Sequence, residues 1–177
     1  MNSASILTGA PAVPVRAPRL LGLYVLLVLV AVVEAFEGLA SAPILFGDMS
    51  DIPGPDVGGA LIKAHIASHP VLALTALVCA AVGNVRYAII ALGALMVMTW
   101  LNYMPSVVLH GLEFNSGFAA LQTTAQIIAF PLMAACAIAL AARNARLGLA
   151  ATLVSIPTLF GVLGVIAFAI GVAVNGF

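Results

Sequence analysis

The charged residues of this chain are separated by long apolar runs, and this spacing constrains the fold more than any other feature. Residues Leu20–Gly47 hold only two charges, Glu34 and Glu37. Further runs without charge cover Ala64–Val85, Tyr87–Leu112, Phe114–Ala142 and Leu147–Phe177. A helix needs about 20 predominantly apolar residues to span a bilayer. We therefore predict five transmembrane helices, over roughly residues 20–46, 59–82, 87–112, 118–142 and 149–174.

The overall composition excludes a soluble domain. Only 7% of the 177 residues are charged and the mean hydropathy is +1.23, whereas soluble domains carry about a quarter charged residues. The formal net charge is zero, so no basic surface is available for nucleic acid. Stretches such as Tyr24–Val33 are continuously apolar rather than alternating, which excludes the strands of a membrane β-barrel. The sequence therefore predicts an all-α integral membrane protein whose main partner is the lipid bilayer.

The chain is predicted to have one domain, a helical bundle over residues 19–177, preceded by a flexible cytoplasmic leader over residues 1–18 with three prolines. The segment Ala40–Ala42 resembles a signal-peptide cleavage site, and cleavage there would leave four helices. However, the apolar stretch before it is longer than a signal core and contains two glutamates. We therefore expect the first helix to be retained.

The basic residues predict the orientation of the bundle. Five of the six Lys and Arg residues fall before the first helix, between the second and third, or between the fourth and fifth. These residues are Arg16, Arg19, Arg86, Arg143 and Arg146. Because cytoplasmic loops carry the excess of Lys and Arg, we predict a cytoplasmic N-terminus and an outside C-terminus, in a bacterial inner membrane.

Polar residues within the predicted helices are the best candidates for a functional site, because such residues are costly in lipid. Glu34 and Glu37 share one face of the first helix, and His65 and His69 share one face of the second. Counted at 1.5 Å per residue from the outer ends, Glu37, His69 and Tyr103 fall at a similar depth. Asn102 and Gln126 fall there too. The sequence predicts a polar cavity that opens outward and is lined by the first four helices.

We predict that this cavity binds a divalent metal ion (Zn, Fe, Mn or Cu), because imidazoles and carboxylates from facing helices suit such ions. The predicted ligands are Glu37, His65, His69 and His110, and the predicted catalytic residues are Glu34 and Tyr103. The corresponding activity would be a redox or hydrolytic reaction on a membrane-soluble substrate. The metalloprotease motif is absent, because Ile66 follows the first histidine.

Three alternatives remain open at this stage. The first is b-type haem held by His65 or His69 together with His110, although their depths differ by about 6–12 Å. The second is proton- or ion-coupled transport through titratable groups in a wet pathway. The third is a purely structural role, in which Glu34 and His69 form a buried hydrogen-bonded pair. A second copy or other membrane subunits would then complete a larger complex.

Overall fold

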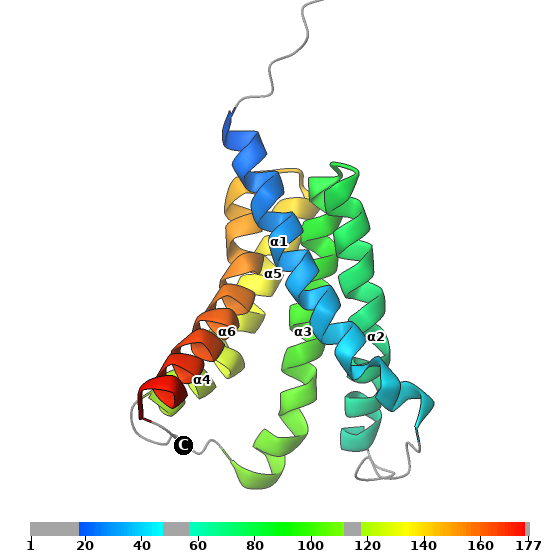
Figure 1. The fold of residues 1–177 in the computed structure, drawn as a ribbon. Coiled ribbons are helices and arrows are strands. Elements are labelled where there is room, and N and C mark those ends of the chain that lie inside the picture. Colours follow the sequence, from blue (N-terminus) through cyan, green and yellow to red (C-terminus); the bar gives the residue numbers. More distant parts are fainter. Residues whose placement is uncertain (1–17, 48–56, 112–117, 176–177) are drawn as a thin grey trace, which may run out of the picture.

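A computed structural model describes residues 18–47, 57–111 and 118–175, and within these residues the secondary structure is helical (Figure 1). The first two long helices are α1 (Pro18–Ser41), continued by the short 3-10 helix η1 (Ala42–Phe46), and α2 (Val57–Ala81). Next come α3 (Val85–His110) and the short α4 (Phe118–Thr124). The π-helix η3 (Ala125–Ala129) leads into α5 (Phe130–Ala142), and α6 (Leu147–Asn175) follows.

The prediction of an all-α membrane bundle is confirmed. Five helices of the described chain are long and apolar enough to cross a membrane, the fourth of them made by η3 and α5 together. Their ends lie within about three residues of the predicted ones, and α4, η3 and α5 together form one continuous helical segment over the predicted fourth span, residues 118–142. The protein is therefore an integral membrane protein. The predicted leader, apart from Pro18, lies outside the described residues.

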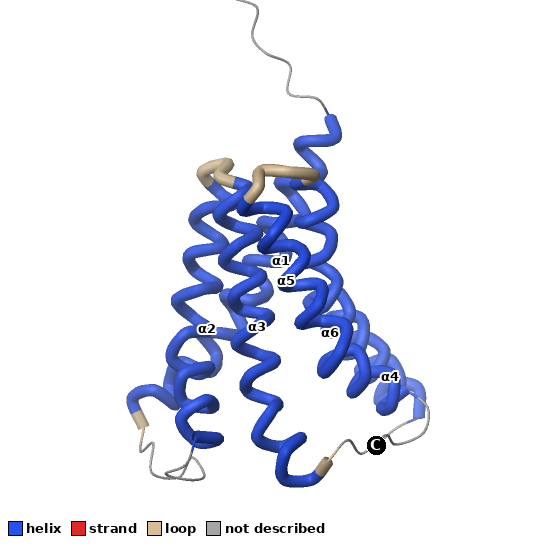
Figure 2. The backbone as a smooth tube through the Cα atoms, turned by 180° about the vertical axis from the view of Figure 1, so that it is seen from behind, coloured by secondary structure: helices blue, strands red, loops and turns tan. Residues whose placement is uncertain are grey.

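The helices are gathered at one end of the bundle and diverge toward the other (Figures 1 and 2). The gathered end holds the turn between α2 and α3 and the turn between α5 and α6. Toward the opposite end, α4 and α6 lean away from α3 in both views. Helix α1 begins at the gathered end and α6 finishes at the divergent end, as the odd number of spans in the described residues requires.

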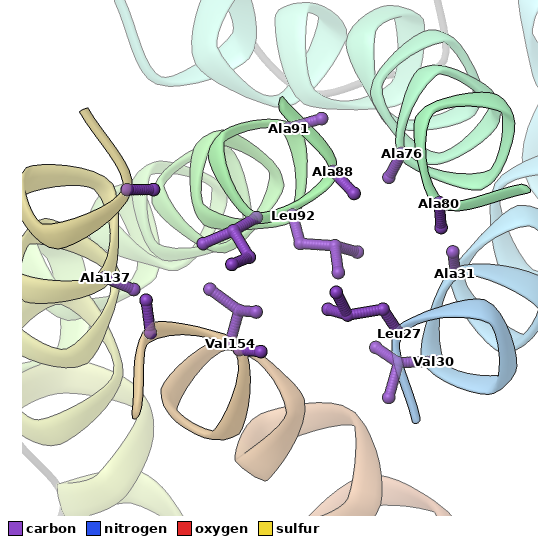
Figure 3. Packing of buried hydrophobic residues seen from close by; sticks show 14 of the residues in the cluster. Leu27, Val30, Ala31, Ala76, Ala80, Ala88, Ala91, Leu92, Ala137 and Val154 are labelled. Carbon is purple, nitrogen blue, oxygen red and sulfur yellow. The ribbon is translucent and has the colours of Figure 1, made fainter. Parts of the chain in front are cut away.

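The gathered end is held by a core of small side chains. Alanines from α2, α3, α5 and α6 are fully buried there, with a few larger side chains between them (Figure 3). Leu27 of α1, Leu92 of α3 and Val154 of α6 point toward one another in this interior. Small residues let membrane helices approach closely, which increases van der Waals contact where no water-driven hydrophobic force acts between them.

Two hydrogen bonds also stabilise the gathered end. The hydroxyl of Tyr24 in α1 donates to the carbonyl of Gly83 in the turn between α2 and α3, at 3.0 Å. Gly83 has φ +83°, a conformation that favours glycine. The guanidinium of Arg86 donates to the carbonyl of Ala142 at the end of α5, at 3.0 Å, where a helix leaves carbonyls without partners. These bonds tie α1, α3 and α5 together at the gathered end.

Candidate intramembrane binding pocket

A cavity of about 330 Å³ lies between α1, α2, α3, η3, α5 and α6. Its lining combines acidic, imidazole, amide, hydroxyl and aromatic side chains, and none of the described lining residues is Lys or Arg. The polar and aromatic members are Glu34, Glu37, His65, His69, Thr99, Trp100, Asn102, Tyr103, Gln126, Phe130 and Thr158. Polar side chains from every long helix therefore meet in one place within the apolar bundle.

Glu34 is the centre of a hydrogen-bonded group that joins three helices. Its Oε2 lies 3.3 Å from Nε2 of His69 on α2, and both side chains are only 12% exposed. Its Oε1 accepts a 2.6 Å hydrogen bond from the hydroxyl of Thr158 on α6. Each carboxylate oxygen therefore has a protein partner, as a carboxylate in a lipid-surrounded bundle requires. The His69 contact fixes Nε2 against Glu34.

The close approach of α1 to α2 brings Glu34 and His69 into contact. A Cβ atom at Gly38, one turn along α1 from Glu34, would lie 3.0 Å from Cα and 3.1 Å from N of Pro70. Glycine therefore allows the two backbones to touch beside His69. Because Pro70 has no N–H, the close contact with Gly38 does not leave an unpaired backbone donor of α2 buried between the helices.

His65 lies next to His69 on the same face of α2. Their ring centroids are 5.3 Å apart with a 41° angle between the planes. Nδ1 of His65 is buried and has no hydrogen-bond partner among the described residues. A buried polar atom of this kind normally has a partner, so a molecule that donates or accepts a hydrogen bond in the pocket would satisfy it.

Glu37 differs from Glu34 in its surroundings. Its side chain lines the same cavity but is exposed, and the described residues provide it with no ion pair or side-chain hydrogen bond. Its backbone carbonyl accepts from the hydroxyl of Ser41 at 2.8 Å. The pocket thus contains one carboxylate with partners and one carboxylate that is free toward the cavity.

Trp100 is fixed in the pocket wall by a hydrogen bond that follows from Pro131. Proline has no N–H, so Pro131 leaves the carbonyl of Ile127 without the donor that an α-helix supplies four residues later. The indole Nε1–H of Trp100 donates to that carbonyl at 3.1 Å. The same stretch is wound as a π-helix, a local distortion often found at functional sites.

The π-helix also carries Gln126, which lines the cavity. Its Nε2 donates to the hydroxyl of Tyr103 on α3 at 3.4 Å. Phe130, which also lines the cavity, packs edge-on against Phe160 of α6, with ring centroids 6.4 Å apart. The fourth span and α3 therefore contribute aromatic rings and amides to the lining.

Most of the predicted site residues meet in this cavity. Glu34, Glu37, His65, His69 and Tyr103 all line it, and their predicted catalytic and ligand roles stay predictions. His110 is the last residue of α3, and its side chain is outside the described part of the structure.

The predicted lining by the first four spans is incomplete, because α6 contributes as well. Pro157, Thr158 and Gly161 of α6 all line the cavity. The sequence feature that could have indicated this contribution is Thr158, a polar residue next to Pro157 in a run without charges.

A metal centre requires several donor side chains to converge on one point. Among the described residues, no three His, Cys, Asp or Glu side chains lie close enough together to hold a metal ion. Three of the predicted ligands, Glu37, His65 and His69, line one cavity together with Glu34. Among these four side chains, Glu34 and His69 are the described pair within hydrogen-bonding distance of each other. Coordination by all four would require Glu37 and His65 to move toward that pair.

No family model, curated protein or solved structure matches this chain.

Proposed function

We propose that this protein binds a cation inside the membrane, in exchange for protons, in the pocket between α1, α2, α3, α5 and α6. The observation that carries the proposal is the charge of the lining. It contains two carboxylates and two imidazoles, and none of its described members is Lys or Arg. With neutral imidazoles and ionised glutamates, such a pocket is anionic, and a low-dielectric surrounding strengthens its attraction for a positive charge.

Proton exchange follows from the cost of an unpaired charge in lipid. Glu37 has no partner within the described residues, so either a proton or a bound cation neutralises it. Entry of a cation therefore releases a proton from the pocket, and departure of the cation takes one up.

The position of the pocket supports access from one side. The small-residue core and the contacts of Tyr24 and Arg86 close the gathered end of the bundle. Arg86, Arg143 and Arg146 lie at that end, which the distribution of basic residues assigns to the cytoplasm. The pocket then faces the outside of a bacterial inner membrane, on the side where the C-terminus lies.

A divalent metal ion is a second candidate, and the donor set favours it. Two carboxylates and two imidazoles from neighbouring helices are ligands that Zn, Fe, Mn and Cu accept. In that case Glu34 would orient His69 through its hydrogen bond, as carboxylates commonly orient metal-bound histidines. A redox or hydrolytic reaction with Glu34 and Tyr103, haem binding through His110, and assembly with other subunits stay predictions.

Proton release on cation binding tests the proposal. The full-length protein, in detergent and in weak buffer, is titrated with ZnCl₂, MnCl₂ or tetramethylammonium chloride while the pH is recorded. We expect at least one of these cations to release protons with a saturable, stoichiometric response. We also expect Glu37→Gln to reduce the release, because it removes the carboxylate that is free toward the cavity.

The matched control is Thr152→Val, which removes a polar side chain from α6 that hydrogen-bonds only to Gly148 of its own helix. This variant is expected to release protons like the wild type. If none of the three cations releases protons from a folded, monodisperse sample, the cation-binding proposal is wrong. The Glu34–His69 pair is then a structural element of the bundle.

A further inference from the structure

We infer that the cation accepted by this pocket is an organic ammonium that carries an aromatic or bulky apolar group, rather than a bare inorganic ion. The inference rests on the proposed cation binding and names its substrate class. It is based on the size of the cavity, the single free carboxylate among the described lining residues and the aromatic residues that share the lining.

The size of the cavity suits a small organic molecule. About 330 Å³ falls within the range of small-molecule pockets, roughly 300–1,000 Å³. A desolvated metal ion occupies only a small part of such a space, and no three metal-binding side chains converge in the described part of the chain. An organic ligand would fill the volume without any movement of the helices.

The carboxylates favour a single positive charge. Both oxygens of Glu34 already accept contacts from His69 and Thr158. Glu37 is the carboxylate left free toward the cavity within the described residues. One ammonium group can therefore pair with Glu37 without displacing any contact, whereas a divalent ion that also used Glu34 would have to displace the contacts of Glu34 with His69 and Thr158.

The aromatic lining residues favour a cation with low hydration. Trp100, Tyr103 and Phe130 line the cavity, and aromatic faces attract quaternary and alkylated ammonium groups. The indole N–H of Trp100 donates a hydrogen bond to the carbonyl of Ile127 at 3.1 Å. The ring is therefore held in place, and its contribution to a ligand is its π surface rather than a hydrogen bond.

The cavity also contains hydrogen-bonding groups that could contact a polar group of the same ligand. Nδ1 of His65 is buried without a partner among the described residues. The amides of Asn102 and Gln126 also line the cavity. An ammonium whose apolar body lies against Trp100 and whose polar end reaches His65 would satisfy both groups of side chains. Such molecules partition into bilayers, so the ligand can also arrive from the lipid.

The fluorescence of Trp100 provides the test, because it is the single tryptophan of the chain and it lines the cavity. The detergent-solubilised full-length protein is titrated with benzyltrimethylammonium chloride. The matched neutral probe is neopentylbenzene, in which carbon replaces the charged nitrogen, and the inorganic probes are ZnCl₂ and MnCl₂. We expect a saturable fluorescence change with the ammonium and no saturable change with the neutral probe.

Variants locate the site. We expect Glu37→Gln to weaken ammonium binding at least about tenfold and Glu37→Asp, which keeps the charge, to retain most of it. Phe130→Leu is expected to weaken binding severalfold. The control Phe168→Leu removes a lipid-exposed ring of α6 outside the cavity and is expected to have no effect.

The outcomes separate the inference from the proposed function. If ZnCl₂ or MnCl₂ binds and releases protons but the ammonium does not bind, the inference is wrong and the proposed cation binding stands. Equal binding of neopentylbenzene, or unchanged ammonium binding in Glu37→Gln, also overturns the inference. If neither the ammonium nor any metal ion binds, both proposals fail.

Discussion

The hydroxyl of Thr158 donates a 2.6 Å hydrogen bond to Glu34, across 124 residues of sequence and between the first and the last long helix. Glu34 contacts His69 of α2 with its other oxygen. One side chain therefore joins α1, α2 and α6 at the level of the cavity. The small-residue core joins the helices elsewhere, at the gathered end.

Replacement of Thr158 by valine tests this link. The change keeps the shape of the side chain but removes the donor, leaving Oε1 of Glu34 without its partner. We expect a loss of about 1–2 kcal/mol in stability, as for hydrogen bonds to charged or membrane-buried groups. The loss is measured as a lower midpoint of denaturation in detergent, and Thr158→Ser is expected to restore most of it.

Gly38→Ala should separate α1 from α2. The new methyl group would lie 3.0 Å from the backbone of Pro70, and strain of this kind costs about 1–3 kcal/mol. Because the contact lies beside His69, cation-dependent proton release should fall together with stability. Gly22→Ala is the control, since a Cβ there has no neighbour within 4 Å; a similar loss in both variants would contradict the prediction.

Trp100 and Pro131 should be energetically coupled. Trp100→Phe removes the donor to the Ile127 carbonyl and is expected to destabilise the protein. In a Pro131→Ala background, residue 131 regains an N–H that can donate to the same carbonyl, so Trp100→Phe should cost less there. A double-mutant cycle measured by denaturation should give a coupling of about 0.5 kcal/mol or more.

The control cycle pairs Trp100→Phe with Pro43→Ala in η1, a proline that does not line the cavity. These two changes are expected to be additive. If Trp100→Phe and Pro131→Ala are additive as well, the prediction is wrong. The hydrogen bond from Trp100 then does not replace the backbone N–H that Pro131 lacks.

The orientation is tested by reporters and by thiol labelling in bacterial cells. A reporter that is active only in the cytoplasm should be inactive when fused after Phe177. In a background without Cys79 and Cys136, Asn144→Cys lies in the turn between α5 and α6. It should be protected in intact cells from a membrane-impermeant thiol reagent and labelled in inverted vesicles. The opposite pattern would reverse the predicted topology.

The sequence by itself determined the class of fold and the number of spans. Lipid offers no hydrogen-bond partners to the backbone, so an apolar run long enough to cross the bilayer forms a helix whatever its neighbours are. The spacing of charges was therefore sufficient to locate all five spans. It also identified Glu34, Glu37, His65 and His69 as unusual, because ionisable groups in such runs are rare.

The rotation of each helix was decided only by tertiary structure. Apart from a few polar side chains, the spans are apolar on all sides, so the sequence gives little indication of which side of each helix turns inward. The inward sides are determined by close contacts between small residues such as Gly38 and the core alanines. These contacts pair Glu34 with His69 and Thr158 and leave Glu37 free toward the cavity. The placement of Trp100 likewise depends on a carbonyl that Pro131 leaves open on another helix. Spacing along one helix fixes depth in the membrane, but only the packing of all five fixes which side chains at that depth meet.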